Sequence, residues 1–306
     1  MELFSVIVAN YNNGKYLPEL IESVKSQTYT SWELIISDDK STDDSLEIIE
    51  PYLSDRRIKL IRHKTNMGAA AAFRSACEAA TGIYVGMLGA DDALLPGAIE
   101  SVVSVHQKYT EASLVYTNYF QCDETLKIIR IGEISKEPIP GKLIYNFFVS
   151  NFATFKKSKY TETEGFNPFF KRALDQDIFL KLDEVGDIVY LPEPLYLYRS
   201  NLNGISQGTN GILATQYHIQ AVVHAYYRRK KSGYNNISYR EYRELLVEYC
   251  MKEIHINYKK KKYINTFARL VQLTTFNIKY LRYFMPRYFA QIINYKFGAM
   301  PFASGR

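Results

Sequence analysis

The chain has 306 residues, 47% of them hydrophobic and 14% aromatic, which allows a large core and excludes an intrinsically disordered protein. Its three cysteines, Cys77, Cys122 and Cys250, show no paired spacing, so we expect free thiols in a reducing compartment. The net charge of +6 is modest and uneven, with basic runs at 228–231 and 259–262. No basic-then-apolar segment precedes the first predicted strand, and no run of about 18 apolar residues occurs. We therefore expect a cytoplasmic protein with neither an export signal nor a membrane span.

The first part of the chain alternates between predicted strands and predicted helices. Continuous apolar, β-branched runs predict buried strands, and apolar residues at helical spacing predict the helices between them. Strands are expected at 3–9, 32–36, 58–61, 84–88 and 113–119, and helices at 17–24, 42–49 and 68–80. This alternation requires crossover connections, so the predicted fold class is α/β and Rossmann-like, with a mainly parallel mixed sheet flanked by helices.

The later part of the chain changes character. Residues 175–177 open a segment with helical apolar spacing, so their carboxylates are expected at the positive end of a helix dipole. Residues 188–198 are interpreted as extended structure interrupted by Pro192 and Pro194. Beyond about residue 207, helical sequence rich in Tyr, Arg, Lys and Leu predicts a second, helical unit.

Polar side chains follow three of the predicted strands. They are Asn10 and Tyr11 after the first, Asp38 and Asp39 after the second, and Asp91 and Asp92 after the fourth. In a parallel sheet, ligands bind beyond the carboxyl ends of the strands. Each of these residues alone can equally be a cap or a turn residue. Their joint placement nevertheless indicates one binding site at one rim.

Seven motifs follow in order between residues 5 and 206. They are Ser5–Asn12; Ser26–Tyr29; Glu33–Asp39 with Ser41 and Asp43; Asn66–Gly68 with Ala72 and Arg74; Leu88–Asp92; Asp175–Asp177 with Leu180–Leu182; and Tyr198–Arg199 with Ser206. With these motifs the chain resembles the family 2 glycosyltransferases over about residues 3–206. The resemblance implies an inverting enzyme with the A-type nucleotide-diphospho-sugar transferase (GT-A) fold. It implies a GT-A domain at 1–206, with a nucleotide-sugar half at about 1–112 and an acceptor half at about 113–206, followed by a helical C-terminal region at 207–306.

The resemblance assigns the donor base to the first two strand ends. Tyr11 would stack on a uracil ring, Asp39 would accept the imide N–H of that ring, and the Ala9 backbone would lie near the base. The alternatives are a surface tyrosine in a turn and a capping aspartate.

A third motif extends the predicted donor site to Asn66, Gly68 and Arg74. In this pattern Arg74 contacts phosphate. The alternatives carry equal weight here: Gly68 opens an alanine-rich helix, and Arg74 is a solvated side chain.

The departing diphosphate concentrates negative charge, and a divalent cation held by a carboxylate would stabilise it. The family supplies an Asp-x-Asp motif for this purpose, but this chain has Gly89 first, then Asp91, followed by Asp92. The resemblance therefore assigns Mn²⁺ or Mg²⁺ to Asp91, with Asp92 as a second candidate ligand. Asn201 stands where many members place a histidine that completes the metal shell, so we expect weak metal binding.

Inversion requires a carboxylate that removes the proton of the attacking acceptor hydroxyl. By motif alignment this general base is Asp175. The family usually has Glu-Asp at this point, whereas this chain has Leu174 before Asp175, so an orienting acid is missing. Asp177 is the neighbouring candidate, and its alternative role is a carboxylate that stabilises the helix start.

The C-terminal region combines aromatic and basic residues, as in the run Tyr226–Lys231. Such helices can lie on an anionic bilayer, which would place the protein at the inner face of the cell membrane. The alternative, which we favour, is that the aromatic residues pack the helices together and the lysines form a solvated face. No nucleic-acid-binding signature accompanies the charge, so no nucleic-acid partner is expected.

The sequence therefore predicts a hexosyltransferase that uses a UDP-sugar donor and a saccharide or lipid-linked saccharide acceptor in cell-surface polysaccharide synthesis. Two other interpretations stay open. One is a catalytically silent paralogue that binds nucleotide sugars, and the other is a basic membrane-surface adaptor built on this fold. Donor hydrolysis, binding without turnover, or neither would distinguish the three.

Overall fold

The computed structural model describes residues 1–139, 148–201 and 211–234, together with single residues between 238 and 257; the side chains of 211–216 are not described. Backbone contacts divide the chain into two compact units, Met1–Asn236 and Ile237–Arg306. The central sheet, its covering helices and the candidate site belong to the first unit. Within the described part of the chain, no helix combines the length and apolar character needed to cross a bilayer.

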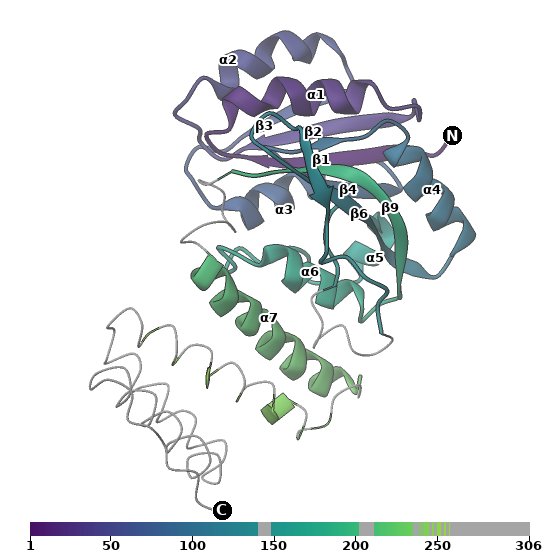
Figure 1. Cartoon of the computed structure of the whole chain (residues 1–306), viewed down its shortest axis with the longest axis vertical. Coiled ribbons are helices and arrows are strands. Elements are labelled where there is room, and N and C mark those ends of the chain that lie inside the picture. The colour runs from purple at the N-terminus through teal and green to yellow at the C-terminus, as the bar shows by residue number, and fades with distance from the viewer. Residues whose placement is uncertain are drawn as a thin grey trace, which may run out of the picture. The chain divides into compact units, whose positions relative to one another are not determined.

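The described strands form one mixed sheet of nine strands (Figure 1). They are β1 (Phe4–Asn10), β2 (Trp32–Asp38), β3 (Ile58–Arg62), β4 (Tyr84–Gly89), β5 (Ala93–Leu94), β6 (Ala112–Cys122), β7 (Ile128–Ile131), β8 (Ala153–Lys156) and β9 (Asp187–Arg199). Their order is β3-β2-β1-β4-β8-β6-β9-β5, with β7 paired to β6. β1 to β4 are mutually parallel, β6 pairs parallel with β9, and β8, β5 and β7 pair antiparallel with their neighbours. The predicted mainly parallel α/β sheet is confirmed.

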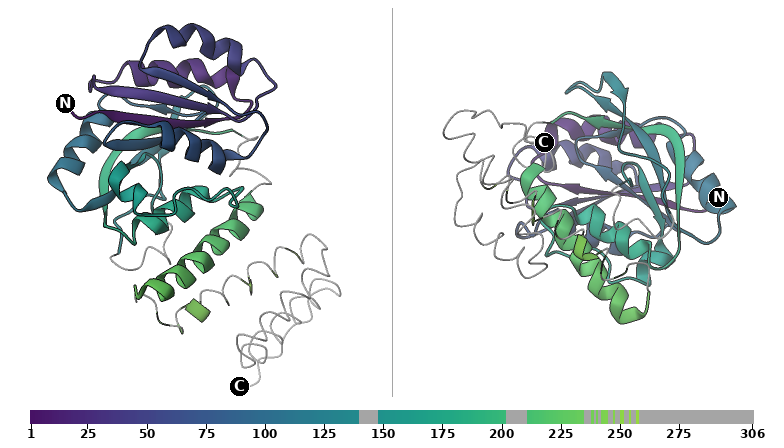
Figure 2. Two further views of the ribbon diagram at one scale, coloured as in Figure 1. Left: turned by 180° about the vertical axis from the view of Figure 1, so that it is seen from behind. Right: turned by 60° about the horizontal axis from the view of Figure 1, so that its bottom comes forward.

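Helices cover both faces of this sheet. They are α1 (Leu17–Lys25), α2 (Ser45–Ile49), α3 (Ala69–Ala79), α4 (Ala98–Lys108), α5 (Lys157–Thr161), α6 (Leu174–Leu182) and α7 (Gly211–Ser232), with short 3₁₀ turns at η1 (Gly14–Tyr16) and η2 (Glu50–Ser54). Figures 1 and 2 show α1 and α2 on one face of the β1–β3 layer and α3 on the other. The crossovers predicted from the alternating pattern therefore place helices on both sides of the parallel strands.

The core follows from the apolar patterns of the first elements. Val6, Ile7 and Val8 of β1 are fully buried, as expected for a parallel strand covered on both faces. The apolar positions of α1 form one stripe that packs on this layer. Gln27 closes the end of α1, because its amide donates to the Leu95 carbonyl oxygen and its carbonyl accepts the Ile99 N–H. The motif around Gln27 therefore joins α1 to the start of α4.

Two elements differ from the sequence expectation. β9 runs without interruption from Asp187 to Arg199, and its two prolines lie where the register against β6 shifts. A proline has no N–H for the ladder, and a bulge accommodates it without ending the strand. The helix expected from residue 42 begins at Ser45, since the Asp43 carboxylate accepts bonds from the Ser45 N–H and hydroxyl.

Candidate active site

The carboxyl ends of four parallel strands lie side by side at one edge of the sheet. The register pairs Ala9 with Gly89, Asn10 with Asp38, and Asp38 with Arg62. The chain passes from β1 outward to β2 and β3, and then returns to the other side of β1 as β4. Such a reversal opens a crevice at the carboxyl ends, which is where ligands bind in sheets of this kind. The strand ends selected from the sequence therefore meet at the switch point between β1 and β4.

Asp38 is a structural residue of this edge. The Asn10 amide donates to Asp38 Oδ2 (2.9 Å), and the Ser41 hydroxyl donates to the same oxygen (2.5 Å). The Ser41 N–H donates to Asp38 Oδ1 (3.0 Å), and Asp38 is almost fully buried. A buried carboxylate with several donors is well satisfied and fixes the loops that it joins. Asp38 thus holds the β1 and β2 loops together and is not presented to a ligand.

Asp39 is also buried, with 2% of its surface exposed, and it joins β2 to the loop before α3. Its Oδ1 accepts the Met67 N–H (2.8 Å) and bonds the His63 Nδ1 (2.8 Å), while its Oδ2 accepts the Gly68 N–H (2.6 Å). The His63 Nε2 in turn bonds the Ser75 hydroxyl (2.9 Å). A carboxylate has about four acceptor positions, so one on Oδ2 remains beyond these three bonds.

Tyr11 and Ala9 lie at the end of β1, next to Asp39 and Asp91 along the edge. Tyr11 follows the last residue of the strand, and its side chain is 45% exposed, so one face of its ring is accessible for stacking. Ala9 is partly buried, and in the register it lies beside Ser37 and Gly89. The structure therefore places both predicted base-site residues at the rim.

The third donor motif opens α3. Gly68 precedes this helix with φ +92°, a left-handed conformation that favours glycine, and Asn66 is exposed just before it. Arg74 points to other partners, because its Nε donates to Glu78 (3.0 Å) and its Nη1 to the Phe166 carbonyl oxygen (3.3 Å). Lys171, which no sequence pattern indicated, has its amine 3.9 Å from the Cβ position of Gly68. The positive charge beside Gly68 is therefore supplied by Lys171, from the segment before α6.

Asp91 is the partly exposed carboxylate of the β4 end. The Asn201 amide donates to Asp91 Oδ2 (2.8 Å), so the residue predicted to replace a metal-ligating histidine does lie beside this carboxylate. Asp91 Oδ1 has no hydrogen-bond donor among the described residues. Within the same part of the chain, no three His, Cys, Asp or Glu side chains gather as a metal-binding group. The donor set is thus one carboxylate with an available oxygen, which suits a hard cation only if other oxygens complete its shell.

Asp92, the second metal candidate of the sequence, has a different environment from Asp91. The Tyr196 hydroxyl donates to Asp92 Oδ2 (2.5 Å), the Arg199 N–H donates to Oδ1 (2.8 Å), and only 4% of Asp92 is exposed. Burial, with the neighbouring charge of Asp91, raises the pKa of Asp92 to about 8. A shielded carboxyl group that already accepts two bonds is less available to a cation than a partly exposed one. Asp91 is therefore the stronger candidate ligand of the two.

The same network explains the glycine at position 89. A Cβ on Gly89 would lie 2.5 Å from Asp92 Oδ2 and 3.1 Å from the Tyr196 hydroxyl, and the Gly89 N–H donates to that hydroxyl (3.0 Å). A larger residue at position 89 would have to displace this buried pair. The absence of the first aspartate of the motif therefore has a local steric reason.

Arg199 holds the backbone of Asp91 in place. Its guanidinium is buried and donates to the Asp91 carbonyl oxygen (2.6 Å), to the Glu19 carboxylate (2.5 Å) and to the Glu124 carbonyl oxygen. It also lies over the Tyr16 ring, 4.6 Å from the centroid. The Tyr198–Arg199 motif of the sequence thus connects β9, α1 and the Asp91 loop.

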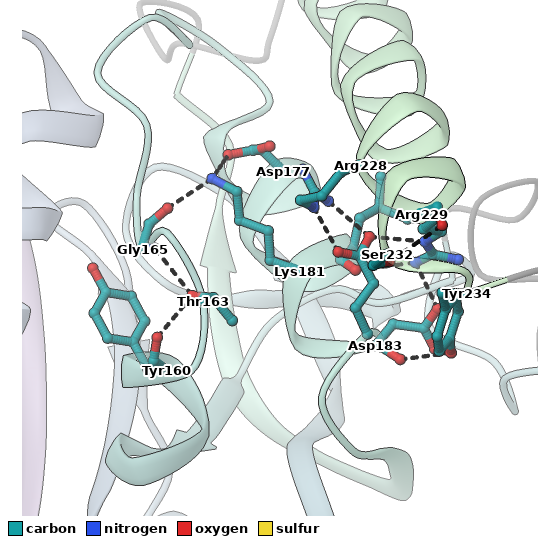
Figure 3. A network of polar contacts seen from close by, with 12 residues as sticks. Tyr160, Thr163, Gly165, Asp177, Lys181, Asp183, Arg228, Arg229, Ser232 and Tyr234 are labelled. Carbon is teal, nitrogen blue, oxygen red and sulfur yellow. Dashed lines mark hydrogen bonds and ion pairs between the residues drawn. The ribbon is translucent and has the colours of Figure 1, made fainter.

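The two carboxylates at the start of α6 are clearly distinct. Asp177 is buried and forms an ion pair with Lys181 (2.7 Å), whose amine also donates to the Gly165 carbonyl oxygen (2.7 Å). Figure 3 shows Lys181 between these two acceptors. Asp175 is exposed, and its Oδ1 accepts the Gln176 N–H (2.9 Å). Asp177 therefore holds the preceding loop, and Asp175 is the carboxylate that a substrate can reach.

The basic run 228–231 does not present four solvated cations. Arg228 and Arg229 both pair with Glu184 (2.5 Å and 2.8 Å), and Arg229 also pairs with Asp183 (2.8 Å) and donates to the Leu180 carbonyl oxygen (3.0 Å) (Figure 3). These contacts join α7 to the end of α6. The expected solvated face concerned the lysines, and Lys230 and Lys231 are exposed, whereas the later run 259–262 lies outside the described residues.

Comparison with known proteins identifies the family of this chain. The sequence model described as "Glycosyl transferase family 2" matches residues 5–179. Over 199 residues the chain is 34% identical to the chondroitin synthase of Escherichia coli, a match that covers 63% of this chain but 28% of that enzyme. It is 31% identical over 188 residues to the E. coli UDP-Glc:alpha-D-GlcNAc-diphosphoundecaprenol beta-1,3-glucosyltransferase WfgD, with 60% of this chain and 70% of that protein covered.

Among solved structures, the chain resembles S. aureus TarS (residues 1–349) in complex with UDP. The TM-score is 0.58 at 18% identity, and the match covers 87% of this chain and 89% of the other. An identity this low shows a shared fold, which here is the predicted GT-A fold. The family match spans more than half of the chain and includes β1 to β4, Asp91 and Asp175. This chain belongs to family 2 of the glycosyltransferases.

Proposed function

We propose that the chain transfers a hexosyl group from a UDP-sugar to a hydroxyl of a saccharide or lipid-linked saccharide acceptor, with inversion. The observation that carries this proposal is the meeting of Tyr11, Asp39 and Asp91 at adjacent strand ends, with Asp175 exposed on α6. The relatives are named for chondroitin synthesis and for glucosyl transfer to a diphosphoundecaprenol-linked sugar, and TarS structures include complexes with UDP and UDP-GlcNAc. Polysaccharide synthesis at the inner face of the membrane is the setting that these names favour.

The donor base would lie between the ends of β1 and β2. The exposed Tyr11 ring offers a stacking face, and the remaining acceptor position of Asp39 can take the N–H of a uracil ring. The N–H groups of Met67 and Gly68 donate to Asp39 and His63 Nδ1 contacts it, so the carboxylate is held in place. A fixed carboxylate acceptor favours bases that present an N–H over bases that present a lone pair.

The diphosphate would lie toward Gly68 and Asp91. Lys171 beside Gly68 supplies positive charge, and Asp91 Oδ1 can hold Mn²⁺ or Mg²⁺ together with the diphosphate oxygens. A bound cation would neutralise charge that develops on the leaving diphosphate. We propose Asn66 as a further donor contact, while Arg74 would have to leave Glu78 to reach a phosphate.

The reaction is a single displacement at the anomeric carbon. The acceptor oxygen forms a bond to that carbon, the bond to the diphosphate oxygen breaks, and the Asp175 carboxylate takes the acceptor proton. Positioning of these groups supplies much of the rate, because a bound acceptor reacts as in an intramolecular step. Attack from the face opposite the leaving group inverts the anomeric centre.

The deciding experiment begins with the full chain and a panel of nucleotide sugars with Mn²⁺. A bound donor should raise the unfolding temperature by mass action, and release of the nucleotide with labelled acceptors should then identify turnover. We expect UDP-sugars to stabilise the chain and transfer to occur with at least one saccharide acceptor. Stabilisation without hydrolysis or transfer would identify a silent nucleotide-sugar-binding paralogue, and no stabilisation by any donor would overturn the proposal.

A further inference from the structure

Helix α7 begins after the region that the family sequence model matches, yet it packs against the helix that carries Asp175. Its buried positions form one stripe. Ala221 and Val222 are followed at helical spacing by Ala225 and Arg229, and each of the four is almost fully buried. His218 precedes Ala221 by three residues and Val222 by four, so it continues the same stripe toward the start of α7.

Contacts along the two helices show that they run in the same direction. Arg229 contacts the Leu180 carbonyl oxygen and Glu184, at the end of α6. Phe170, just before α6, has its ring 6.4 Å from the ring of Tyr217, near the start of α7. Lower numbers on α6 therefore lie beside lower numbers on α7.

This order places His218 beside the start of α6, where Asp175 lies. Burial lowers the pKa of the His218 imidazole, and the Asp175 carboxylate acts on that pKa in the opposite direction. The first effect favours the neutral imidazole, and the second is the effect of an opposite charge on the neighbouring helix. A neutral imidazole carries one N–H, which can donate to a carboxylate.

On α6 itself, the donor that the Asp175 carboxylate has among the described residues is a backbone N–H and not a side chain. Leu174 is apolar, and Gln176 is buried and offers Asp175 its backbone N–H. Asp177 is held by Lys181. A general base works well only if its carboxylate is held toward the hydroxyl proton. A side chain from another element could hold the Asp175 carboxylate in that orientation.

We propose that His218 is the positioning residue of Asp175: its N–H holds the carboxylate toward the acceptor hydroxyl, so α7 completes the acceptor side of the active site. This inference rests on the proposed transferase function. It assigns a part in catalysis to a helix outside the region that defines the family in this chain. During the reaction the acceptor proton moves to Asp175, while the His218 proton stays on the imidazole.

The first test examines the interaction between His218 and Asp175 without measuring sugar transfer. The imidazole signals of the full chain are followed by NMR from pH 4 to 8, and His218 is assigned from the signal that His218→Gln removes. Because Asp175 raises the pKa of His218, Asp175→Asn should lower it further. Asp187→Asn, which removes an exposed carboxylate at the start of β9, is the control and should leave that signal unchanged. An unchanged His218 titration in Asp175→Asn would overturn the proposal.

The second test asks whether the pair serves transfer. His218→Leu should lower kcat by roughly tenfold to a hundredfold, the worth of one hydrogen bond to a charged group, with the KM for the donor unchanged. His218→Asn keeps an N–H donor and should recover part of that loss. His224→Gln is the matched control, since His224 lies on the same helix stacked on Phe169, 5.7 Å between ring centroids, and should keep full kcat.

The outcomes separate the two proposals. If His218→Leu folds with a normal unfolding temperature and transfers at the wild-type rate, His218 does not position the base and the transferase proposal stands. If the wild-type chain transfers no sugar from any donor, the transferase proposal fails, and with it the catalytic purpose of the pair. Loss of transfer in His218→Leu that His218→Asn does not relieve would show a packing role and would also overturn the inference.

Discussion

Neighbouring carboxylates in this chain have opposite environments, and the difference separates structural from chemical residues. Asp92 is enclosed by Tyr196 and Arg199, whereas Asp91 keeps an oxygen that has no donor among the described residues. A buried charge must be paired or neutralised. A carboxylate that is paired in this way has few acceptor positions available to a substrate. The partly exposed member of the pair is therefore the one available for chemistry.

The same contrast at the start of α6 leads to a test of the general base. Asp175→Asn keeps the shape of the side chain and removes its basicity, so transfer should fall by roughly 10²–10⁴-fold. Donor affinity should stay close to wild type, because the loss is confined to the transition state. Steady-state transfer kinetics and calorimetric donor titration check the two parts.

Asp177→Asn is the matched comparison. It breaks the buried pair with Lys181, so it should cost about 3–5 kcal/mol of unfolding free energy and leave the chemical step of the folded fraction largely intact. Chemical denaturation measures the first effect. Near-normal transfer by Asp175→Asn, with transfer abolished in folded Asp177→Asn, would show that Asp177 is the base.

Asp39 is predicted to select the nucleobase. Asp39→Ala should weaken UDP binding by about 1.5–3 kcal/mol, the usual worth of a hydrogen bond to a charged group. The variant should also lose stability, because the N–H groups of Met67 and Gly68 lose their acceptor. Asp44→Ala, an exposed acidic residue of the same loop, is the control for calorimetry. Unchanged UDP affinity in Asp39→Ala would place the base elsewhere.

The Asp91–Asn201 contact leads to a test of metal use. We expect transfer to need Mn²⁺ or Mg²⁺ at high free concentration, since Asp91 is the carboxylate available to the cation. Asp91→Asn should remove metal-stimulated transfer, and Asn201→His should lower the metal concentration for half-maximal activity by supplying a nitrogen ligand. Activity titrated against free metal measures both, and full activity in excess chelator would contradict the assignment.

At the scale of the secondary-structure elements, the buried carboxylate of Glu33 connects neighbouring strands of the parallel layer. Glu33 of β2 accepts bonds from Ser5 of β1 (2.6 Å), from Lys59 of β3 (2.6 Å) and from the N–H and hydroxyl of Thr81 before β4. Burial alone would raise the pKa of Glu33, but the bonds from Lys59, Ser5 and Thr81 outweigh it and lower the pKa from 4.5 to about 2. One side chain thus connects four segments of the donor half.

This pKa predicts acid sensitivity with a defined sign. Because the pKa of Glu33 is lower in the folded state, its contribution is fully present above pH 4.5 and is lost as the pH falls toward 2. Wild type should exceed Glu33→Gln by about 2–3 kcal/mol of unfolding free energy at pH 7, and the difference should shrink below pH 4.5. Urea denaturation at several pH values measures it, with exposed Glu47→Gln as control. A difference that does not depend on pH would contradict this account.

Across the whole molecule, the position of α7 decides where the catalytic unit ends. The compact unit extends to Asn236, whereas the sequence expectation ends the transferase domain at 206. Without α7, the carboxylates of Asp183 and Glu184 would lose Arg228 and Arg229, and the surface of α6 would lose its cover. We therefore propose that α7 belongs to the catalytic unit.

Two shortened chains test this boundary. A chain that ends at Asn236 should unfold cooperatively and be stabilised by UDP-sugars, because it keeps the ion pairs and the buried stripe of α7. A chain that ends at Ser206 should unfold at a markedly lower temperature or aggregate, since paired charges and apolar surface become exposed. Equal unfolding temperatures for the two chains would show that α7 is dispensable and would restore the boundary at 206.

The sequence by itself determined the layout of the donor half. Apolar runs and helical spacing are local signals, and packing reinforces them in β1 to β4 and in α1 and α3, so the predicted elements agree with the structure to within a few residues. The ordered motifs also determined the family, because they record residue types at the strand ends. A local signal is sufficient when the tertiary structure does not oppose it.

The tertiary structure decided what individual polar residues do. Asp92 accepts a hydrogen bond from Tyr196, 104 residues away, and Arg199 pairs with Glu19, 180 residues away, so no local pattern could reveal either contact. The motifs ranked Asp91 over Asp92 and Asp175 over Asp177, but the burial and the partners of each carboxylate came from the fold. The inclusion of Arg228, Arg229 and His218 in the catalytic unit likewise depends on helix packing. Burial and pairing set the free energy of a charge, and both are properties of the folded chain.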